Sequence, residues 1–96
     1  MKTSKDLIKE HIARLEAVMK LFRGNNSDAI SALDEAKKAL SDKELPADDG
    51  RELYEPAVYN ALASINSSPV TSKINNVLYH AVSDALEELK IILEML

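Results

Sequence analysis

The sequence predicts an all-α protein that folds as an antiparallel up-down-up-down four-helix bundle with long first and last helices. Three observations support this prediction. Apolar residues recur at spacings of three and four along four segments, which is the period of an amphipathic helix. Short polar connections that contain glycine, proline or serine separate these segments. No segment has the strict alternation of apolar and polar residues that is typical of a half-buried strand.

Composition indicates one globular domain over residues 1–96, because 46% of the 96 residues are apolar and 29% are charged. The absence of cysteine excludes disulfides, thiolate metal sites and cysteine nucleophiles, and it fits a reducing compartment. The first twenty residues carry a charge every two or three positions, unlike a signal peptide, and no segment reaches membrane-spanning length. We therefore expect a cytoplasmic protein without direct membrane insertion.

Local signals place the first two helices. Thr3 or Ser4 is a candidate N-cap with Asp6 at the capping-box position, and Gly24 is a candidate C-terminal glycine. The first apolar stripe contains Ile8, Ile12, Leu15, Met19 and Phe22, and the second contains Ala29, Leu33, Ala36 and Leu40. The four helices are expected at about residues 4–23, 27–41, 51–66 and 69–95.

The third and fourth helices follow an acidic connection over about residues 42–50. Asp49 with Glu52 suggests a cap, and Pro56 falls near the first turn, although the helix could instead begin at Pro56. Ser68 followed by Pro69 predicts the start of the last helix. Its stripe runs through Val70, Ile74, Val77, Leu78, Ala81, Ala85, Leu89, Ile92 and Leu96, and its length of about 40 Å exceeds that of helices two and three.

Short connections make sequential helices antiparallel, so the first and last helices are expected to be neighbours. Residues 1–24 carry a net charge of +3, residues 25–67 of −5 and residues 68–96 of −2. The arrangement brings Lys5 and Lys9 near the end of the last helix that carries Glu87, Glu88 and Glu94. A general nucleic-acid partner is not expected, because only the first helix offers a diluted basic face.

Neither histidine belongs to a recognisable catalytic or metal-binding pattern. His11 lies within or beside an apolar stripe and is interpreted as a hydrogen-bonded core histidine, whereas His80 lies away from its stripe and is interpreted as a surface residue. The paired Glu-x-x-His pattern of metal-binding bundles and the ligand rhythm of a calcium loop are both missing. We predict no catalytic residue, metal ligand or cofactor.

The candidate partner surface contains Tyr59, Tyr79, His80, Ile91 and Met95. On a helical wheel, Tyr59 projects well off the apolar stripe of the third helix, and Tyr79 lies at the margin of the stripe of the last helix. Exposed tyrosines are enriched at protein interfaces because the ring is apolar and the hydroxyl is polar. Ile91 and Met95 lie near the opposite side of the last helix from its main stripe, in the final stretch "LKIILEML". They need a cover, which could be the acidic connection, the start of the first helix or a second copy of the chain in a homodimer.

One stretch of the chain resembles a known family. A short acidic second helix, a proline-bearing loop, a helix with "VYNAL", and "SSP" before a helix with an early "LY" are similar to the class IIa bacteriocin immunity proteins, the enterocin A immunity family, over about two-thirds of the chain. The resemblance implies a cytosolic four-helix bundle that recognises a bacteriocin-bound membrane receptor. Many members have a tail after the fourth helix that contributes to specificity, and this sequence shows no counterpart of it. No functional residue is therefore carried over from the family.

These observations favour a small non-enzymatic protein that acts through protein–protein interaction. Two alternatives remain open at this point: a cytosolic bacteriocin immunity protein, and a metal- or ligand-binding bundle that uses His11, His80 and the acidic connection.

Overall fold

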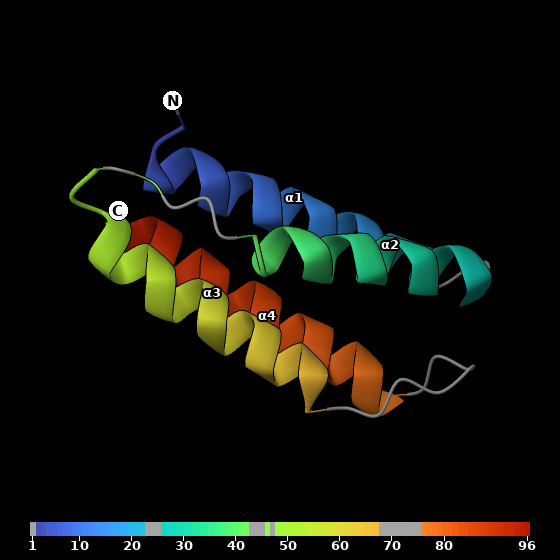
Figure 1. The fold of residues 1–96 in the computed structure, drawn as a ribbon. Coiled ribbons are helices and arrows are strands. Elements are labelled where there is room, and N and C mark those ends of the chain that lie inside the picture. The colour runs from blue at the N-terminus through green and yellow to red at the C-terminus, as the bar shows by residue number, and fades with distance from the viewer. Residues whose placement is uncertain (1, 23–25, 43–45, 47, 68–75) are drawn as a thin grey trace.

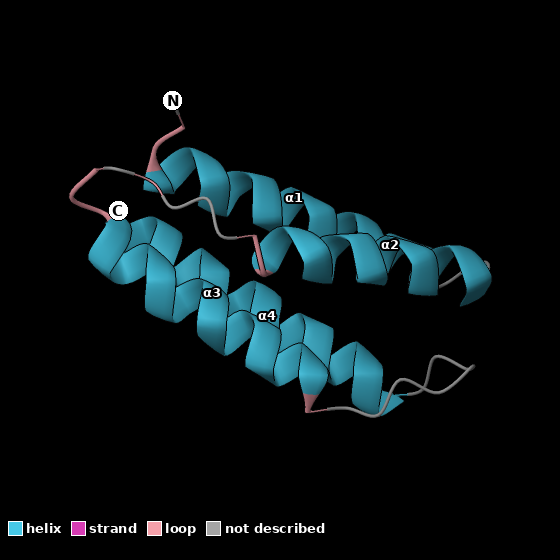
Figure 2. Cartoon of the chain, viewed as in Figure 1, coloured by secondary structure: helices cyan, strands magenta, loops and turns pink. Residues whose placement is uncertain are grey.

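Four helices make up most of the computed structural model, which describes residues 2–22, 26–42, 46, 48–67 and 76–96. The helices are α1 (Ser4–Leu21), α2 (Asn26–Leu40), α3 (Arg51–Asn66) and α4 (Asn76–Met95). Successive helices run in opposite directions, so that α1 and α3 begin at the end of the molecule where α4 ends (Figure 1). Figure 2 draws only helices and loops in the described residues. The prediction of an antiparallel all-α bundle is therefore confirmed.

The bundle is elongated, with extents of 39 × 20 × 20 Å. α1 packs against α2 and α4, and α3 packs against α4, so the expected contact between the first and last helices is present. α1 and α4 have 18 and 20 residues, against 15 and 16 for α2 and α3. The buried core comes from all four helices and contains Ile8, Ile12, Leu15, Val18, Leu33, Ala36, Leu40, Tyr54, Ala57, Val58, Ala61, Ile65, Leu78, Val82, Ala85 and Leu89.

The predicted capping box starts α1. The Thr3 hydroxyl accepts a hydrogen bond from the Asp6 N–H at 3.2 Å, and the Asp6 carboxylate accepts one from the Thr3 N–H at 3.4 Å. These bonds satisfy backbone N–H groups that have no partner within the helix. Thr3, rather than Ser4, is the N-cap.

α3 spans the predicted residues 51–66, whereas the end of α1 and both ends of α2 differ from the predicted ends by one or two residues. α1 ends at Leu21 and α2 spans Asn26–Leu40, because Phe22 and Ser41 already lie in turns. Gly24 and the predicted start of the last helix at Ser68 and Pro69 lie outside the described residues, and α4 is described from Asn76.

The start of α3 corrects two expectations. Gly50 is the N-cap and makes no side-chain capping bond, so the predicted cap from Asp49 and Glu52 is wrong. The Gly50 carbonyl accepts bonds from the N–H groups of Leu53 and Tyr54 at 3.0 and 2.9 Å, so the helix is established before Pro56. Pro56 is an exposed residue inside the helix, in its second turn and not at its start. The Tyr54 side chain of α3 is buried and its hydroxyl contacts His11 of α1. This packing explains why α3 extends upstream of Pro56.

The beginnings of α1 and α3 and the end of α4 meet in a close contact. A Cβ atom added to Gly50 would lie 2.7 Å from Leu96 Cδ2 and 2.9 Å from Ser4 Cβ. Ser4 is fully buried, and its N–H and hydroxyl both donate to the Asp48 carboxylate, the hydroxyl at 2.5 Å. The core side of the last turn of α4 is therefore covered by the start of α1 and by Gly50.

The predicted ion pairs between the first and last helices do not form. The ion pairs between described residues are Lys2–Glu10 and Arg51–Glu55, and none involves Lys5 or Lys9. Apolar packing therefore holds α1 against α4, and exposed pairs would add only about 0–1 kcal/mol each. Among the described residues, no helix is long and apolar enough to cross a membrane.

Candidate functional site

One side of α4 faces solvent along the described length of the helix, and we call it the outward face of α4. It contains His80, Asp84, Glu87, Ile91 and Met95, which follow one another at spacings of four, three, four and four residues. Residues at these spacings lie above one another on a helix. All five side chains are exposed.

The opposite side of α4 explains why this face is free. Leu78, Val82, Ala85 and Leu89 also recur at spacings of three and four, and each is at most 1% exposed. Their burial against the other helices fixes the rotation of α4 about its axis. Ile91 and Met95 lie outside this stripe, so the rotation that buries Leu89 leaves them in solvent.

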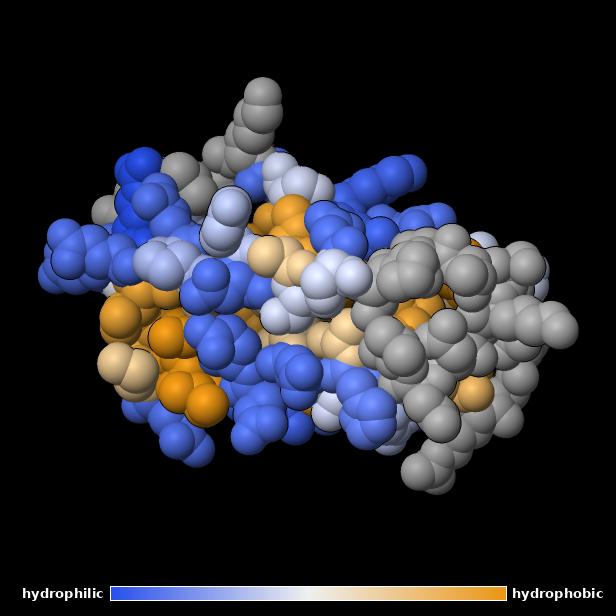
Figure 3. All heavy atoms as spheres, turned by 90° about the horizontal axis from the view of Figure 1, so that it is seen from below, coloured by the Kyte–Doolittle hydropathy of each residue, from blue (hydrophilic) through white to orange (hydrophobic). Residues whose placement is uncertain are grey.

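The end of the outward face nearer the C-terminus is apolar. Ile91 is 50% exposed and Met95 is 62% exposed, and they lie one helical turn apart. Seen from below, the surface has a hydrophobic area at the end of the bundle where α4 ends (Figure 3). An exposed isoleucine and methionine on adjacent turns form an apolar ridge of the kind that partner helices bind.

The other end of the outward face is polar. His80 is exposed, and the next turns carry Asp84 and Glu87. His80 and Ile91 are eleven positions apart in the sequence, which corresponds to about 16 Å along the helix axis. The structure therefore brings His80, Ile91 and Met95 onto one face but does not bring them into contact.

Tyr79 lies to one side of this face. Its ring centroid is 5.8 Å from that of Phe22, which follows α1, and 5.9 Å from that of His80 in an edge-to-face arrangement. These contacts leave the residue 37% exposed. Tyr79 thus packs at the margin of the core, as its position on the helical wheel predicts, and its ring contacts Phe22 and His80.

Tyr59 is the most exposed of the candidate residues, at 73%, and it lies on α3. No hydrogen bond or ring contact holds its side chain among the described residues. The five predicted residues therefore divide into the outward face of α4, a packed tyrosine beside it and a separate exposed tyrosine on another helix.

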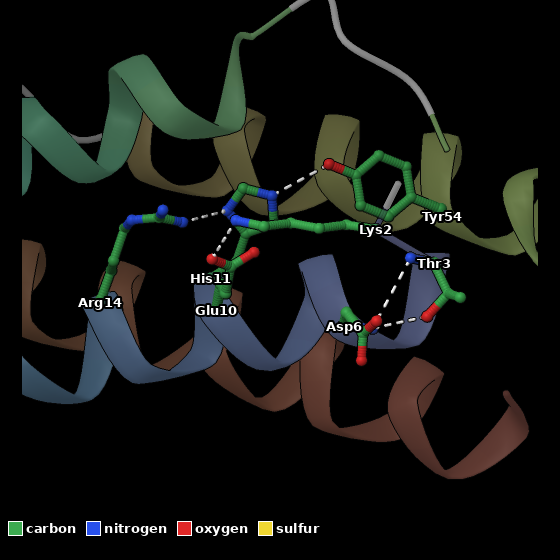
Figure 4. A network of polar contacts seen from close by, with 7 residues as sticks. All are labelled: Lys2, Thr3, Asp6, Glu10, His11, Arg14 and Tyr54. Carbon is green, nitrogen blue, oxygen red and sulfur yellow. Dashed lines mark hydrogen bonds and ion pairs between the residues drawn. The ribbon is translucent and has the colours of Figure 1, made fainter. Parts of the chain in front are cut away.

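A polar cluster crosses the bundle from α1 to α3 (Figure 4). The His11 ring, 3% exposed, lies with its Nε2 atom 3.0 Å from the Tyr54 hydroxyl. On the other side of the ring, Nδ1 lies 3.4 Å from a guanidinium nitrogen of Arg14. Because arginine can only donate, Nδ1 accepts, and the proton resides on Nε2, which donates to Tyr54. The prediction of a hydrogen-bonded core histidine is confirmed.

Burial controls the ionisation of this pair. Removal from water, together with the positive charge of Arg14, lowers the pKa of His11 to about 4. Burial also raises the pKa of the Tyr54 hydroxyl above its ordinary value of 10.0. Both side chains are therefore neutral near pH 7, which suits a structural hydrogen bond between two helices.

Two surface carboxylates hold the beginning of α1. The Lys2 ammonium lies 2.6 Å from Glu10 Oε1, and this hydrogen bond lowers the pKa of Glu10. The hydrogen bond from the Ser4 hydroxyl lowers the pKa of Asp48. Sequence patterns did not identify the Ser4–Asp48 contact, because the two residues are 44 positions apart. For the contact between His11 and Arg14, the sequence offers one signal: the two residues are three positions apart.

The described residues offer no obvious metal centre. No group of three or more histidine, aspartate or glutamate side chains is arranged to hold a metal ion within the described residues. Both ring nitrogens of His11 are already engaged by Tyr54 and Arg14. A metal ion at His11 would have to displace both of these contacts.

Comparison with known proteins gave no relative: no protein-family model, curated protein or solved structure matches this chain.

Proposed function

We propose that this protein is a non-enzymatic interaction protein that binds a protein partner through the outward face of α4. The observation that carries the proposal is the pair Ile91 and Met95, 50% and 62% exposed on adjacent turns of a helix whose other side is buried. Leaving both side chains in water forgoes burial of roughly 1–3 kcal/mol each, which a partner would recover.

Two further features support this role. The helices that flank the surface are held by a continuous core, so a partner would meet a preformed surface and little ordering entropy would be lost. The buried polar residues, by contrast, are committed to joining α1 to α3, since His11 is bonded on both sides. The proposal therefore assigns His11 and Tyr54 a structural role and the outward face the binding role.

Affinity capture with matched variants tests the proposal. The wild-type protein, Ile91→Ser/Met95→Ser and Tyr59→Ser would be compared as baits at near-physiological concentration, after circular dichroism has shown equal helix content. We expect a captured protein that is lost with the α4 variant and retained with Tyr59→Ser, which removes a still more exposed side chain from α3. A strictly monomeric protein that captures nothing, or capture that is equal for all three baits, would contradict the proposal.

Self-association is one form of this proposal that can be tested directly, because a second copy could cover Ile91 and Met95. Light scattering on the wild type and on Ile91→Glu/Met95→Lys separates the cases. A dimer mass that becomes a monomer mass in the variant places the outward face in the dimer interface. A dimer mass that persists in the variant would show that Ile91 and Met95 lie outside the dimer interface.

A cytosolic immunity protein is a sharper version of the same proposal. The antiparallel four-helix fold is the one that the resemblance implies, and the outward face of α4 would then contact the bacteriocin-bound receptor. Expression of the chain in a bacteriocin-sensitive cell is expected to raise tolerance, and the Ile91→Ser/Met95→Ser variant is expected to lose this effect. Unchanged sensitivity to several pediocin-like peptides would dispose of the immunity version and leave the general proposal standing.

A further inference from the structure

We infer that the partner of the outward face of α4 is a cationic amphipathic helix, with apolar side chains on one side and lysine or arginine beside them. This inference rests on the proposed function, because it names the chemistry of the partner that the same face binds. Two observations support it: the charges on α4 and the spacing of the exposed apolar residues of α4.

The apolar end of the outward face is surrounded by carboxylates. Glu87 and Glu88 lie one turn before Ile91, and Glu94 lies one turn after it. Between Asn76 and Leu96 the chain has four acidic residues and one basic residue, Lys90. None of the four carboxylates forms an ion pair with another described residue. Uncompensated charge of one sign around an apolar centre attracts a partner of the opposite sign.

The apolar residues favour a helix as the binding element. Ile91 and Met95 are spaced by four residues, so they form a ridge along one helix that fits between the i and i+3 or i+4 side chains of another. Backbone N–H and C=O groups of α4 are bonded within the helix, so this surface offers no edge to which an extended strand could pair. Met95 can adapt its flexible side chain to the partner's surface.

The same charges argue against other occupants. Symmetric pairing of α4 with α4 of a second copy would place the glutamates of both copies close together, at a cost in free energy. Nucleic acid and anionic membrane surfaces are repelled for the same reason. A cationic helix turns this repulsion into attraction, and it buries Ile91 and Met95 at the same time.

Binding of two designed peptides tests the inference on the full chain. The first is a fluorescein-labelled helix of about 14 residues with leucine at every third or fourth position and lysine beside them. The second has glutamate in place of every lysine. By fluorescence anisotropy, we expect the lysine peptide to bind at least about tenfold more tightly than the glutamate peptide. Its affinity should fall as salt is raised.

Variants locate the binding. Ile91→Ser/Met95→Ser should weaken binding of the lysine peptide about tenfold or more. Glu87→Gln/Glu88→Gln should weaken it about two- to fivefold and reduce the salt dependence. Asp34→Asn/Glu35→Gln removes two exposed carboxylates from α2, and Tyr59→Ser removes an exposed apolar side chain from α3; both controls should retain wild-type affinity.

Several results would overturn the inference: no binding of the lysine peptide, equal binding of both peptides, or equal weakening by the Asp34→Asn/Glu35→Gln control. Self-association of the wild type in sedimentation velocity that Ile91→Ser/Met95→Ser abolishes would make a second copy the occupant. If the peptide fails while affinity capture still depends on Ile91 and Met95, the proposed function stands and the cationic-helix inference falls. If both fail, the outward face is not an interface.

Discussion

The last two turns of α4 have one side that is closely packed and one side that is uncovered. Leu89 is fully buried, and Leu96 lies so close to Gly50 that one added carbon atom would meet it at 2.7 Å. Ile91 and Met95, on the same turns, are 50% and 62% exposed. The four residues are all large and apolar, so hydrophobicity alone does not separate them. The position of each side chain around the helix decides which ones the start of α1 and Gly50 can cover.

This difference indicates that the exposure of Ile91 and Met95 is not fraying of a helix end. A frayed end would lose packing on all sides, whereas here the core side is held by the Ser4–Asp48 contact and by Gly50. The uncovered side therefore belongs to a helix end that is packed on its other side. Four predictions follow this contrast from the largest expected effect to the smallest.

Truncation of neighbouring residues on the two sides should have unequal effects on stability. Leu89→Ala should lower the free energy of unfolding by about 2–5 kcal/mol, because it leaves a cavity in the core. Ile91→Ala should change it by less than about 0.5 kcal/mol, because the side chain lies in solvent. Urea unfolding at several protein concentrations measures both. Comparable losses for the two variants would mean that the outward face is already covered in solution.

Gly50→Ala should destabilise the packed end by about 2 kcal/mol, because the added Cβ overlaps Leu96 and Ser4. Gly50 has φ of −70°, so the requirement for glycine comes from space and not from backbone conformation. In a Leu96→Ala background the same change should cost less, since one of the two overlaps has been removed. Thermal unfolding of the four proteins in this cycle measures the coupling, and an equal cost in both backgrounds would refute it.

Acid should destabilise the protein through its buried histidine. The folded-state pKa of His11 is lowered to about 4, below the value of 6.5 expected in the unfolded chain. Between these values the unfolded chain binds a proton that the folded protein does not, so stability is complete above about pH 6.5 and falls toward pH 4. We expect a loss of about 2 kcal/mol between pH 7 and pH 4.5, because each unit of pKa difference is worth about 1.4 kcal/mol.

Urea titrations at pH 7 and pH 4.5 measure this loss, with two histidine variants for comparison. His11→Gln should be less stable than the wild type at pH 7 but should lose less on acidification. His80→Gln retains His11, so its stability should fall on acidification as much as that of the wild type. The folded-state pKa values of Glu10 and Asp48 are lowered from 4.5 and 3.8, so protonation of these carboxylates adds a further loss as the pH falls below those values. An unchanged decrease in His11→Gln would show that another group is responsible.

Ser4→Ala should have the smallest of these effects, a loss of about 1 kcal/mol, because it removes one hydrogen bond to Asp48 and leaves the bond from the backbone N–H. Ser41→Ala is the matched control: its hydroxyl donates to the Lys37 carbonyl at 2.6 Å on an exposed turn. Differential scanning calorimetry should resolve the pair. A loss at Ser41 as large as that at Ser4 would argue that the buried contact contributes no more than an exposed one.

Periodicity predicted most of the fold. The spacing of Leu33, Ala36 and Leu40 on α2, and of Leu78, Ala85 and Leu89 on α4, identified core positions that the structure buries. The Thr3 and Asp6 capping box was also visible, because its two residues are three positions apart and bond only to each other. Such features are local, so sequence reasoning can reach them. The start of α3 at residue 51 was also predicted, but its cap was not, because Gly50 takes the N-cap position without a side-chain bond.

The candidate surface was predicted in part. Sequence placed Ile91 and Met95 off the main stripe and Tyr59 well away from its own stripe, and all three are exposed. It also grouped Tyr79 with them, although the ring packs against Phe22. That contact joins residues 57 positions apart in the sequence, so no spacing rule could have revealed it.

The sequence by itself determined the class of fold, the number of helices and the side of each helix that is buried, because these depend on a period of 3.6 residues along the chain. Only the tertiary structure decided which groups meet across helices: His11 with Tyr54, Ser4 with Asp48, and Gly50 with Leu96. These contacts depend on how far each helix is shifted along its neighbour and rotated about its axis. Side-chain volumes throughout the core set those two quantities together, and the same rotation of α4 leaves Ile91 and Met95 facing solvent.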